Sequence, residues 1–282
     1  MKIKKALIIG FGSIGRRHYK ILKDHKIVKN IKIFSSQEIV PNKLDNLNES
    51  IKFDPDLIII ASTTNTHLKY IKFIEKNLKG KKVLIEKPVF NNYIKLKLKN
   101  NKYFIGYNFR YDPVLNYIKK LILNEKLFSV ICQNYSYLPD WRKNRDYSKT
   151  SSAQKKYGGG VLRDLSHEID YIVWLFGKVK INYSHNKKIS NLKINTDDEL
   201  LINCLSKKVK NITISINFYS KFLLRKVYVY GDNLSIEGDL INKKVKYFKK
   251  NKYYEKSWNK NNKDLNYVKQ LKDVIKEKNI RS

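Results

Sequence analysis

The chain has 282 residues, 42% hydrophobic and 30% charged, so it is long enough for two domains with separate cores. Its formal net charge is +34, but the excess comes from lysine spread along the whole chain, which argues against a specific nucleic-acid binder. No apolar run reaches the roughly 18 residues that a membrane helix needs and no signal peptide precedes the first strand, so we expect a cytoplasmic protein without a membrane partner.

The first predicted element is a strand buried on both faces, because residues 6–9 form a continuous apolar run. The segment Gly10–Gly15 (GFGSIG) follows it and leads into a helix predicted from Ser13 to His25. Gly10 permits a tight turn, Gly12 lets the backbone approach a pyrophosphate, and Gly15 lets the helix pack against the strand. The free N–H groups of the helix then face the phosphates. The predicted contacts to a dinucleotide here are Gly10, Gly12, Ser13, Ile14 and Gly15.

The end of the second predicted strand, Ile31–Phe34, bears on the choice of cofactor. In dinucleotide-binding proteins an acidic residue at this point holds the ribose hydroxyls of NAD. Here the strand is followed by Ser35-Ser36-Gln37, and Glu38 is the first acid. Since no carboxylate at the strand end repels a 2′-phosphate, NAD and NADP both fit the sequence. The residues expected at this end of the cofactor are Ser35 and, for a phosphate, Arg16, Arg17 or a nearby lysine.

The rest of the N-terminal half extends the same sheet. Buried strands are predicted at 56–61, 82–85 and 103–106, and a helix runs from the polar segment Ser62–His67 to about Leu78. Right-handed crossovers bring the carboxyl ends of all parallel strands to one edge, so the residues that follow each strand meet there. The additional cofactor contacts predicted at this edge are Ser62, Thr63, Asn65, His67 and Glu86.

Lys87 stands out among the many lysines because it follows a buried strand at this ligand-binding edge. Pro88 restricts its backbone to extended geometry. Partial desolvation and a nearby cationic nicotinamide both lower the pKa of a lysine toward the range useful for acid–base catalysis. The sequence therefore predicts that Lys87 transfers a proton and contacts the cofactor, with Glu86 orienting it or contacting the cofactor itself.

A second chemical cluster follows the three glycines at 158–160. An amphipathic pattern predicts a helix from Val161 to about Phe176. Asp164, His167, Asp170 and Trp174 are three to four residues apart, which places them on one face of this helix. A carboxylate beside a histidine can fix its tautomer and raise its basicity. The alternative is an ordinary ion pair on the surface of the helix.

The segment between residues 137 and 154 bears on the substrate. It is polar and aromatic and carries arginines, among them Arg142 and Arg145. Trp141 or Tyr147 would stack on a sugar ring, and the arginines would bind a carboxylate or phosphate. The alternative is a loop that anchors a dimer or domain interface.

The remaining C-terminal strands alternate apolar and polar residues, for example at 212–218 and 227–230, as antiparallel strands with one covered face do. The other face is rich in Tyr and Phe, which favours a homodimer or homotetramer formed through this sheet. The segment Lys249–Lys263 is predicted to be a solvated loop. Cys132 and Cys204 lack metal-ligand spacing, which predicts buried reduced thiols and no bound metal.

Taken together and in this order, these motifs resemble the Gfo/Idh/MocA family of oxidoreductases over nearly the whole chain. The resemblance rests on Gly10–His18, Thr64–His67, Glu86–Pro88, Gly106–Arg110 and Asp164–Asp170. It implies an enzyme that transfers a hydride between NAD or NADP and a hydroxyl or keto carbon of a sugar, sugar derivative or nucleotide-sugar. The segment around Trp141 is similar to a subgroup associated with surface-sugar biosynthesis.

The resemblance also implies roles for single residues. Lys87 resembles the proton-transfer lysine of the family and His167 the histidine that faces the reacting hydroxyl, while Asp164 or Asp170 resembles a substrate-binding carboxylate. Many relatives carry an aspartate four residues before this histidine, whereas Arg163 occupies that position here. The expected catalytic residues are Lys87, His167 and Asp164, and the expected substrate contacts are Arg110, Trp141, Arg142, Asp164, His167 and Asp170.

We therefore expect an α/β protein with two domains. Residues 1–111 form a Rossmann domain that binds NAD or NADP, and residues 112–282 form an α+β domain with an open, mainly antiparallel sheet that binds substrate and oligomerises. The alternatives are a non-catalytic nucleotide-binding sensor or scaffold on the same fold, and a protein that attracts polyanions through its charge alone.

Overall fold

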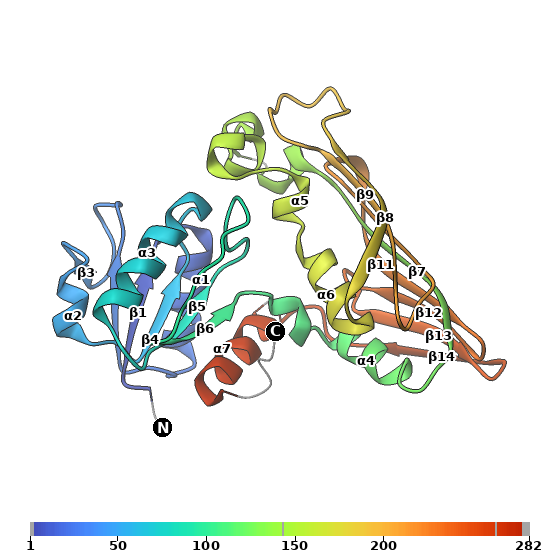
Figure 1. The fold of residues 1–282 in the computed structure, drawn as a ribbon, viewed down its shortest axis with the longest axis horizontal. Helices are drawn as coiled ribbons and strands as arrows, with labels where there is room; N and C mark the ends of the chain where they lie inside the picture. Colours follow the sequence, from blue (N-terminus) through green and yellow to red (C-terminus); the bar gives the residue numbers. More distant parts are fainter. Residues whose placement is uncertain (1–2, 143, 263, 278–282) are drawn as a thin grey trace. The chain divides into compact units, whose positions relative to one another are not determined.

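The computed structural model describes residues 3–142, 144–262 and 264–277. The chain divides into two units, which we describe separately (Figure 1). The first unit contains Met1–Asn108 together with Asp264–Ser282, and the second contains Phe109–Lys263.

The first unit contains a six-stranded parallel sheet with strand order β3-β2-β1-β4-β5-β6. The order reverses between β1 and β4, which is where open α/β sheets bind ligands. Its strands are β1 (Lys5–Ile9), β2 (Asn30–Phe34), β3 (Lys43–Leu44), β4 (Leu57–Ile60), β5 (Lys82–Ile85) and β6 (Lys102–Ile105), and its helices are α1 (Ser13–Asp24), α2 (Glu49–Phe53), α3 (Thr64–Asn77) and α7 (Leu265–Lys276).

The two central strands explain why the sequence pattern predicted this sheet. Ala6–Ile9 in β1 and Leu57–Ile60 in β4 are completely buried, because helices cover both faces of the sheet. On one face Ile21 and Leu22 of α1 pack against the sheet, and on the other face Ile71 and Ile74 of α3 do so. The expected parallel Rossmann sheet is therefore confirmed.

The last described helix, α7, belongs to the first unit. Val268, Leu271 and Val274 lie along one face of α7 and join the hydrophobic cluster that contains Ile21 and Leu22 of α1. The sequence-based division at residue 111 placed this helix in the second domain, and that assignment is wrong for α7. The spacing of its apolar residues predicts a buried helix face but does not identify the core that the face joins.

The second unit contains an eight-stranded sheet with order β14-β13-β12-β11-β7-β10-β9-β8. All neighbours are antiparallel except β7 and β10, so the predicted mainly antiparallel sheet is confirmed. Its strands are β7 (Leu127–Tyr137), β8 (Val179–Lys187), β9 (Glu199–Ser206), β10 (Asn211–Asn217), β11 (Tyr219–Gly231), β12 (Leu234–Asp239), β13 (Lys244–Lys249) and β14 (Lys252–Ser257).

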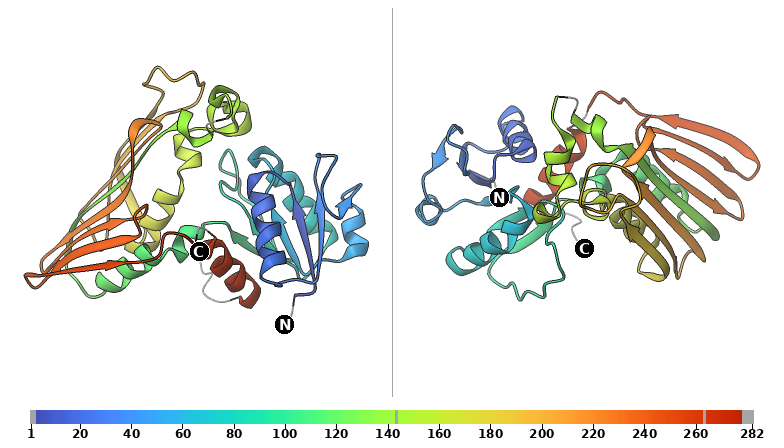
Figure 2. Two further views of the ribbon diagram at one scale, coloured as in Figure 1. Left: turned by 180° about the vertical axis from the view of Figure 1, so that it is seen from behind. Right: turned by 90° about the horizontal axis from the view of Figure 1, so that it is seen from above.

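Helices α4 (Pro113–Leu121), α5 (Val161–Asp164) and α6 (His167–Phe176) lie on the same side of this sheet in both Figure 1 and the left view of Figure 2. The sheet residues facing them are buried, such as Cys132 and Val227. Alternate residues point to the opposite face, where Ile131 and Tyr228 are half-buried and Tyr183 is exposed.

Two local predictions for the second unit are wrong. The predicted helix from Val161 to Phe176 is divided into α5 and α6 by Leu165 and Ser166. The predicted loop Lys249–Lys263 contains strand β14, which pairs with β13 at the edge of the sheet. Its lysine-rich composition masked a strand with all six side chains exposed. No helix among the described residues combines the length and apolarity needed to cross a bilayer.

Candidate functional site

Two of the three glycines after β1, Gly10 and Gly15, have a structural reason to lack a side chain, and Gly12 lies open. Gly10 has a φ of +94°, and a Cβ there would lie 2.5 Å from the backbone N of Ser62. A Cβ on Gly15 would overlap the carbonyl oxygen of Gly10, so α1 can approach the turn only with glycine at this position. At Gly12 a Cβ would meet no described atom within 4 Å, and the backbone lies open for close approach of a ligand.

The first turn of α1 provides backbone donors beside these glycines. Gly12 is the N-cap residue, Ser13 and Ile14 follow it, and Ser13 is exposed. Among the described residues no side chain caps this helix, and its first turn contains no acidic residue. Free N–H groups and the positive end of the helix dipole favour an anion here. The turn and the helix start therefore fit the pyrophosphate of a dinucleotide.

Arg16 lies beside the end of β2, where the adenosine ribose of a dinucleotide binds in this fold. Its Nη2 donates to Oε1 of Gln37 at 2.8 Å, and its Nε donates to the carbonyl oxygen of Phe11 at 3.2 Å. The guanidinium carbon is 4.9 Å from the centre of the Phe11 ring. Ser35 accepts a hydrogen bond from the backbone N of Gln37. A cation therefore lies beside this strand end, and Ser35 is half-buried.

The segment after β4 is held by its own side chains. The hydroxyl of Thr66 donates to Oγ of Ser62 at 2.8 Å. Both ring nitrogens of His67 lie 3.1 Å from carbonyl oxygens, Nε2 from that of Ser62 and Nδ1 from that of Val89. Burial lowers the pKa of His67, although both carbonyls and the charge of Glu86 act to raise it. His67 thus ties the loop after β4 to the loop after β5.

Thr63 and Asn65 are the other cofactor contacts predicted in this segment. Thr63 is the N-cap residue of α3 and is exposed, and Asn65 is exposed in the first turn of the helix. They follow β4 at the same edge of the sheet as Gly10 follows β1, as the parallel topology requires. His67 is buried, so its role is to hold the loops rather than to present a side chain to solvent.

Glu86 and Lys87 follow β5 at this same edge. Glu86 is 7% exposed, and its Oε1 is 2.7 Å from Nε2 of the fully buried His18. Lys87 is half-buried and is joined to Pro88 by a cis peptide bond. His18 was not among the residues predicted from the sequence, although its position on the inner face of α1, three residues after Gly15, marks it as facing the sheet.

In the second unit His167 opens α6 and is 9% exposed. Its ring centroid is 4.7 Å from that of Phe109. Asp164 ends α5, and the turn at Leu165 and Ser166 separates it from His167. The prediction that Asp164 shares a helix face with His167 is therefore wrong, because the two residues belong to different helices.

Arg110 and Asp170, both predicted to contact substrate, bind each other. Nη2 of Arg110 donates to Oδ1 of Asp170 at 2.6 Å, and Nε donates to Oδ2 at 3.0 Å. The Asp170 side chain is 6% exposed, and burial raises its pKa against the opposing effect of Arg110. This bidentate pair lies within the same unit as His167, three residues further along α6.

Sequence reasoning missed a buried polar group next to His167. Nε of Arg225 on β11 donates to Oε1 of Glu168 at 2.7 Å, and the guanidinium carbon lies 3.9 Å from the centre of the Phe109 ring. The hydroxyl of Tyr171 is 3.3 Å from the same carboxylate oxygen. Periodicity could have found these residues, because Glu168 shares the buried face of α6, and Arg225 is two residues before the buried Val227.

The loop predicted to bind substrate forms a series of 3-10 turns, η2 (Leu138–Arg142), η3 (Tyr147–Lys149), η4 (Ser151–Ala153) and η5 (Lys155–Tyr157). Trp141 is 40% exposed and packs edge-on against the buried Phe218 at 5.1 Å. Arg142 is exposed. The hydroxyl of Tyr147 accepts a hydrogen bond from the backbone N of Lys193, so this ring is fixed in the loop. Trp141 and Arg142 thus remain accessible to a ligand.

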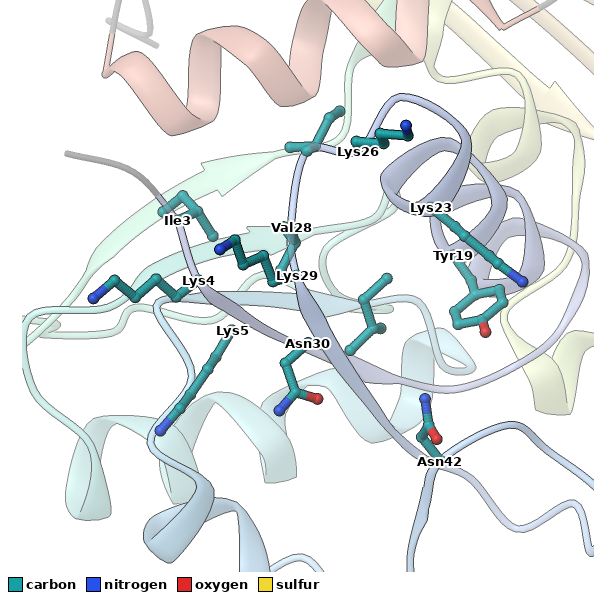
Figure 3. A pocket seen from close by; sticks show the side chains of 12 residues that line it. Ile3, Lys4, Lys5, Tyr19, Lys23, Lys26, Val28, Lys29, Asn30 and Asn42 are labelled. Atoms are coloured by element: carbon teal, nitrogen blue, oxygen red, sulfur yellow. The ribbon is translucent and has the colours of Figure 1, made fainter.

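A separate pocket of about 830 Å³ lies at the amino ends of β1 and β2, at the opposite edge of the sheet from Gly10 (Figure 3). Figure 3 shows Lys5 and Asn30 extending from the strands, Lys4 from the residue before β1, and Tyr19 and Lys23 from α1. Lysines around an apolar surface are expected in so lysine-rich a chain. None of the residues that line this pocket is among the proposed catalytic residues. The candidate site is therefore the carboxyl edge of the first sheet and, separately, the region of His167.

Comparison with known proteins agrees with this geometry. The chain is 26% identical over 223 residues to glucose-6-phosphate 3-dehydrogenase of Bacillus subtilis (strain 168), a match that covers 71% of this chain and 62% of the relative. Levoglucosan dehydrogenase of Pseudarthrobacter phenanthrenivorans is 28% identical over 138 residues, covering 46% of this chain and 35% of the relative. The chain spans between 30% and 62% of the length of the curated relatives it matches.

Solved structures show the same fold at low sequence identity. An oxidoreductase from Thermotoga maritima has a TM-score of 0.79 and 17% identity, covering 99% of this chain and 88% of that one. The WlbA dehydrogenase from Bordetella pertussis, solved with NADH and UDP-GlcNAcA, has a TM-score of 0.73 and 12% identity, covering 98% and 84%.

Family models match both parts of the chain. Residues 4–97 match the oxidoreductase family with an NAD-binding Rossmann fold, and residues 119–276 match the C-terminal alpha/beta domain of the same family. These matches contain the glycine turn, Lys87, His167 and Arg225 described above. The chain therefore belongs to the Gfo/Idh/MocA oxidoreductase family.

Proposed function

We propose that this protein is an NAD(P)-dependent oxidoreductase that transfers a hydride between a nicotinamide and a hydroxyl or keto carbon of a sugar, sugar derivative or nucleotide-sugar. The observation that carries the proposal is the arrangement of residues at the carboxyl edge of the first sheet. There a turn and helix start that fit a pyrophosphate lie on the same side of the sheet as a half-buried lysine, Lys87. Cofactor binding and proton transfer are the two requirements of alcohol oxidation.

The proposed roles follow from the chemistry of each side chain. When bound, the nicotinamide accepts or supplies the hydride. Lys87 removes the hydroxyl proton during oxidation and returns it during reduction, and His167 serves as a hydrogen-bonding group for a hydroxyl of the substrate. Asp164 completes the proposed catalytic set, although it lies on α5 rather than beside His167 on α6. Proton transfer in both directions requires groups whose pKa lies near the working pH.

For the substrate we propose a sugar bearing an anionic group. The exposed Trp141 supplies a surface on which a sugar ring can stack, and Arg142 supplies a charge for a carboxylate or phosphate. The net charge of +34 attracts anionic ligands at low salt. One relative named for glucose 6-phosphate and two structures that contain UDP-GlcNAcA support this substrate class. Arg110 and Asp170, which already bind each other, contribute to substrate binding as a pair.

For the cofactor we propose that Arg16 makes NADPH at least as good a ligand as NADH. The guanidinium of Arg16 lies beside the end of β2, and the first acidic residue, Glu38, follows that end at a distance of four positions. A variant Arg16→Gln, which removes the charge, should weaken NADPH binding by roughly tenfold, or about 1.4 kcal/mol, and change NADH binding little. Equal effects on the two cofactors would contradict this assignment.

We also propose that the protein forms a homodimer or homotetramer through the open face of the second sheet. Tyr183 on β8 is 55% exposed and Tyr230 on β11 is 39% exposed, and large apolar side chains exposed on a sheet face favour a protein partner. Sedimentation velocity of the full chain measures the oligomeric state directly, and a monomer at micromolar concentration would contradict the proposal.

The test of the proposed function is a titration of the purified protein with NADH and with NADPH, followed by fluorescence. Glucose 6-phosphate, UDP-GlcNAc, UDP-GlcNAcA and myo-inositol are then added with the better oxidised cofactor, and reduction is followed at 340 nm. Tight binding together with sugar-dependent reduction supports the proposal. Tight binding without reduction of the cofactor by any of these sugars favours the alternative of a nucleotide-binding sensor or scaffold.

A further inference from the structure

Glu86 lies against α1 and the end of β6, and α7 contacts its histidine partner. Nε2 of His18 on α1 lies 2.7 Å from its Oε1. Just after β6, a Cβ on Gly106 would come within 2.9 Å of the same carboxylate, so a larger residue there would displace it. The ring of Tyr267 on α7 packs edge-on against His18, with centroids 5.5 Å apart. Glu86 is therefore held in one position immediately before Lys87.

The hydrogen bond between His18 and Glu86 is buried. His18 is completely buried, and its Nδ1 has no hydrogen-bond partner within the described part of the chain. Burying a carboxylate and an imidazole is less favourable than burying two apolar side chains of the same size, so we expect the pair to serve a purpose other than stability. The position of the pair next to the proposed proton-transfer residue indicates what that purpose is.

We propose that the His18–Glu86 pair is a positioning device for Lys87, sealed by Tyr267 of α7. It fixes the backbone at the end of β5 and keeps a negative charge beside the lysine. This inference rests on the proposed function, because Lys87 is the group assigned there to proton transfer. It also gives the last helix a role in the site, since Tyr267 covers the buried face of His18.

Several other charged or titratable groups lie around this pair. Arg17 on α1 is 3.2 Å from the carboxylate of Asp264, and its guanidinium lies 5.1 Å from the centre of the Tyr267 ring. Burial, together with the charge of Glu86, raises the pKa of Tyr267, so this hydroxyl stays protonated at neutral pH. On α3, His67 also feels the charge of Glu86. Of these groups, Glu86 is the one joined directly to Lys87 in the chain, so the test addresses the lysine through Glu86.

The experiment measures the titration of Lys87 itself and needs no substrate. The full-length protein is treated with trace acetic anhydride at a series of pH values, and acetylation at Lys87 is quantified by mass spectrometry. In Glu86→Gln, which keeps the side-chain shape, the midpoint should fall by about one pH unit, because a neighbouring negative charge favours the ammonium. His18→Leu should lower it similarly, because a buried carboxylate without its donor takes up a proton.

The double variant and a conservative variant sharpen the test. If the two residues act as one unit, His18→Leu combined with Glu86→Gln shifts the midpoint no further than either change alone. His18→Gln, which keeps a side-chain donor, should restore most of the wild-type midpoint. The matched control is the pair His185 and Glu199 in the second unit, whose Nε2 and Oε2 are 3.3 Å apart. His185→Leu and Glu199→Gln should leave the Lys87 midpoint unchanged.

The outcomes separate this inference from a merely structural role and from the proposed function. The inference is overturned if Glu86→Gln has a lower melting temperature but its Lys87 midpoint stays within roughly 0.2 pH units of the wild-type value. If His18→Leu does not fold, Glu86→Gln alone decides. A shifted midpoint in a protein that reduces no cofactor would leave the positioning role standing and contradict the proposed function instead.

Discussion

Two buried glutamates, Glu86 in the first unit and Glu168 in the second, invite comparison. Each is next in sequence to a residue with a proposed catalytic role, Lys87 and His167. Each also makes a 2.7 Å contact with a nitrogen from a distant part of the chain. The partners differ, because Glu86 meets a histidine on α1 whereas Glu168 meets Arg225 on β11.

This difference in partner changes what each pair can do. An imidazole gains or loses its proton near neutral pH, whereas a guanidinium stays charged. Burial alone lowers the pKa of Arg225, but the Glu168 carboxylate outweighs it and the net pKa is raised. The Glu168 pair is therefore a fixed ionic bond suited to hold Phe109 and the start of α6 in place. The Glu86 pair is the one that we propose positions its neighbour Lys87.

The largest expected effect is on turnover, in the first unit. Lys87→Ala should lower the turnover number by roughly 10² to 10⁴, the scale of a lost acid–base group, and leave the affinity for NADH or NADPH nearly intact. Steady-state kinetics with the best sugar, together with fluorescence titration of the cofactor, measure both. Lys95→Ala, an exposed lysine beyond the same strand, is the matched control. Equal turnover in the two variants would remove Lys87 from the mechanism.

The next effect is on stability, in the second unit. Arg225→Met leaves the Glu168 carboxylate buried without its partner, which should lower the free energy of unfolding by roughly 3–5 kcal/mol. Adding Glu168→Leu should recover most of this loss, because the remaining side chains are then apolar. Urea unfolding followed by circular dichroism measures both variants. If Arg225→Met costs less than about 1 kcal/mol, the pair is not the fixed ionic bond that the comparison requires.

A smaller effect tests whether backbone groups bind the dinucleotide at the first site. Gly12→Ala should leave the free energy of unfolding within about 1 kcal/mol of wild type, because an added methyl group meets no described atom within 4 Å. Dinucleotide affinity should nonetheless fall by roughly tenfold or more, since the methyl group occupies the approach to the backbone. Gly15→Ala is the contrasting variant, because its methyl group overlaps the carbonyl of Gly10 and destabilises the fold. Unchanged dinucleotide affinity in Gly12→Ala would place the pyrophosphate elsewhere.

The smallest effect is a pH dependence of stability at His67. Its pKa in the folded protein lies below the usual value of 6.5, chiefly because of burial. The unfolded chain therefore binds the proton first, and the free energy of unfolding falls as the pH decreases from about 6.5 through the lowered pKa. In His67→Asn the slope in this window should decrease by up to about 1.4 kcal/mol per pH unit. An unchanged slope would show that His67 does not titrate differently on unfolding.

Much of the first site could be predicted from the sequence because its parts are contiguous. The residues Gly10–Gly15 form one turn, and the strand before it is a continuous apolar run, so local pattern alone places the backbone donors. The parallel topology then brings Glu86 and Lys87 to the same edge. The contact between His18 and Glu86 could not be read in the same way, because it joins residues 68 positions apart.

The second site was less predictable because it depends on contacts between distant segments. Apolar periodicity runs through Leu165 and Ser166 and predicts one helix. In the structure Asp197 accepts a hydrogen bond from the backbone N of Leu162 and so holds the start of α5, 35 residues earlier in the chain. Arg225 is similarly separated from Glu168 by 57 positions. Local pattern gives the faces of these elements but not their partners.

The return of α7 to the first unit has a consequence for the order of synthesis. A ribosome completes residues 1–108 long before it reaches Leu265, since the whole second unit is made in between. At about 5–20 residues per second this interval is roughly 8 to 30 seconds. During that time the side chains of Ile21 and Leu22 lack the cover that α7 later provides. We therefore expect the nascent first unit to expose an apolar stripe beside α1, which chaperones recognise, until the last helix emerges.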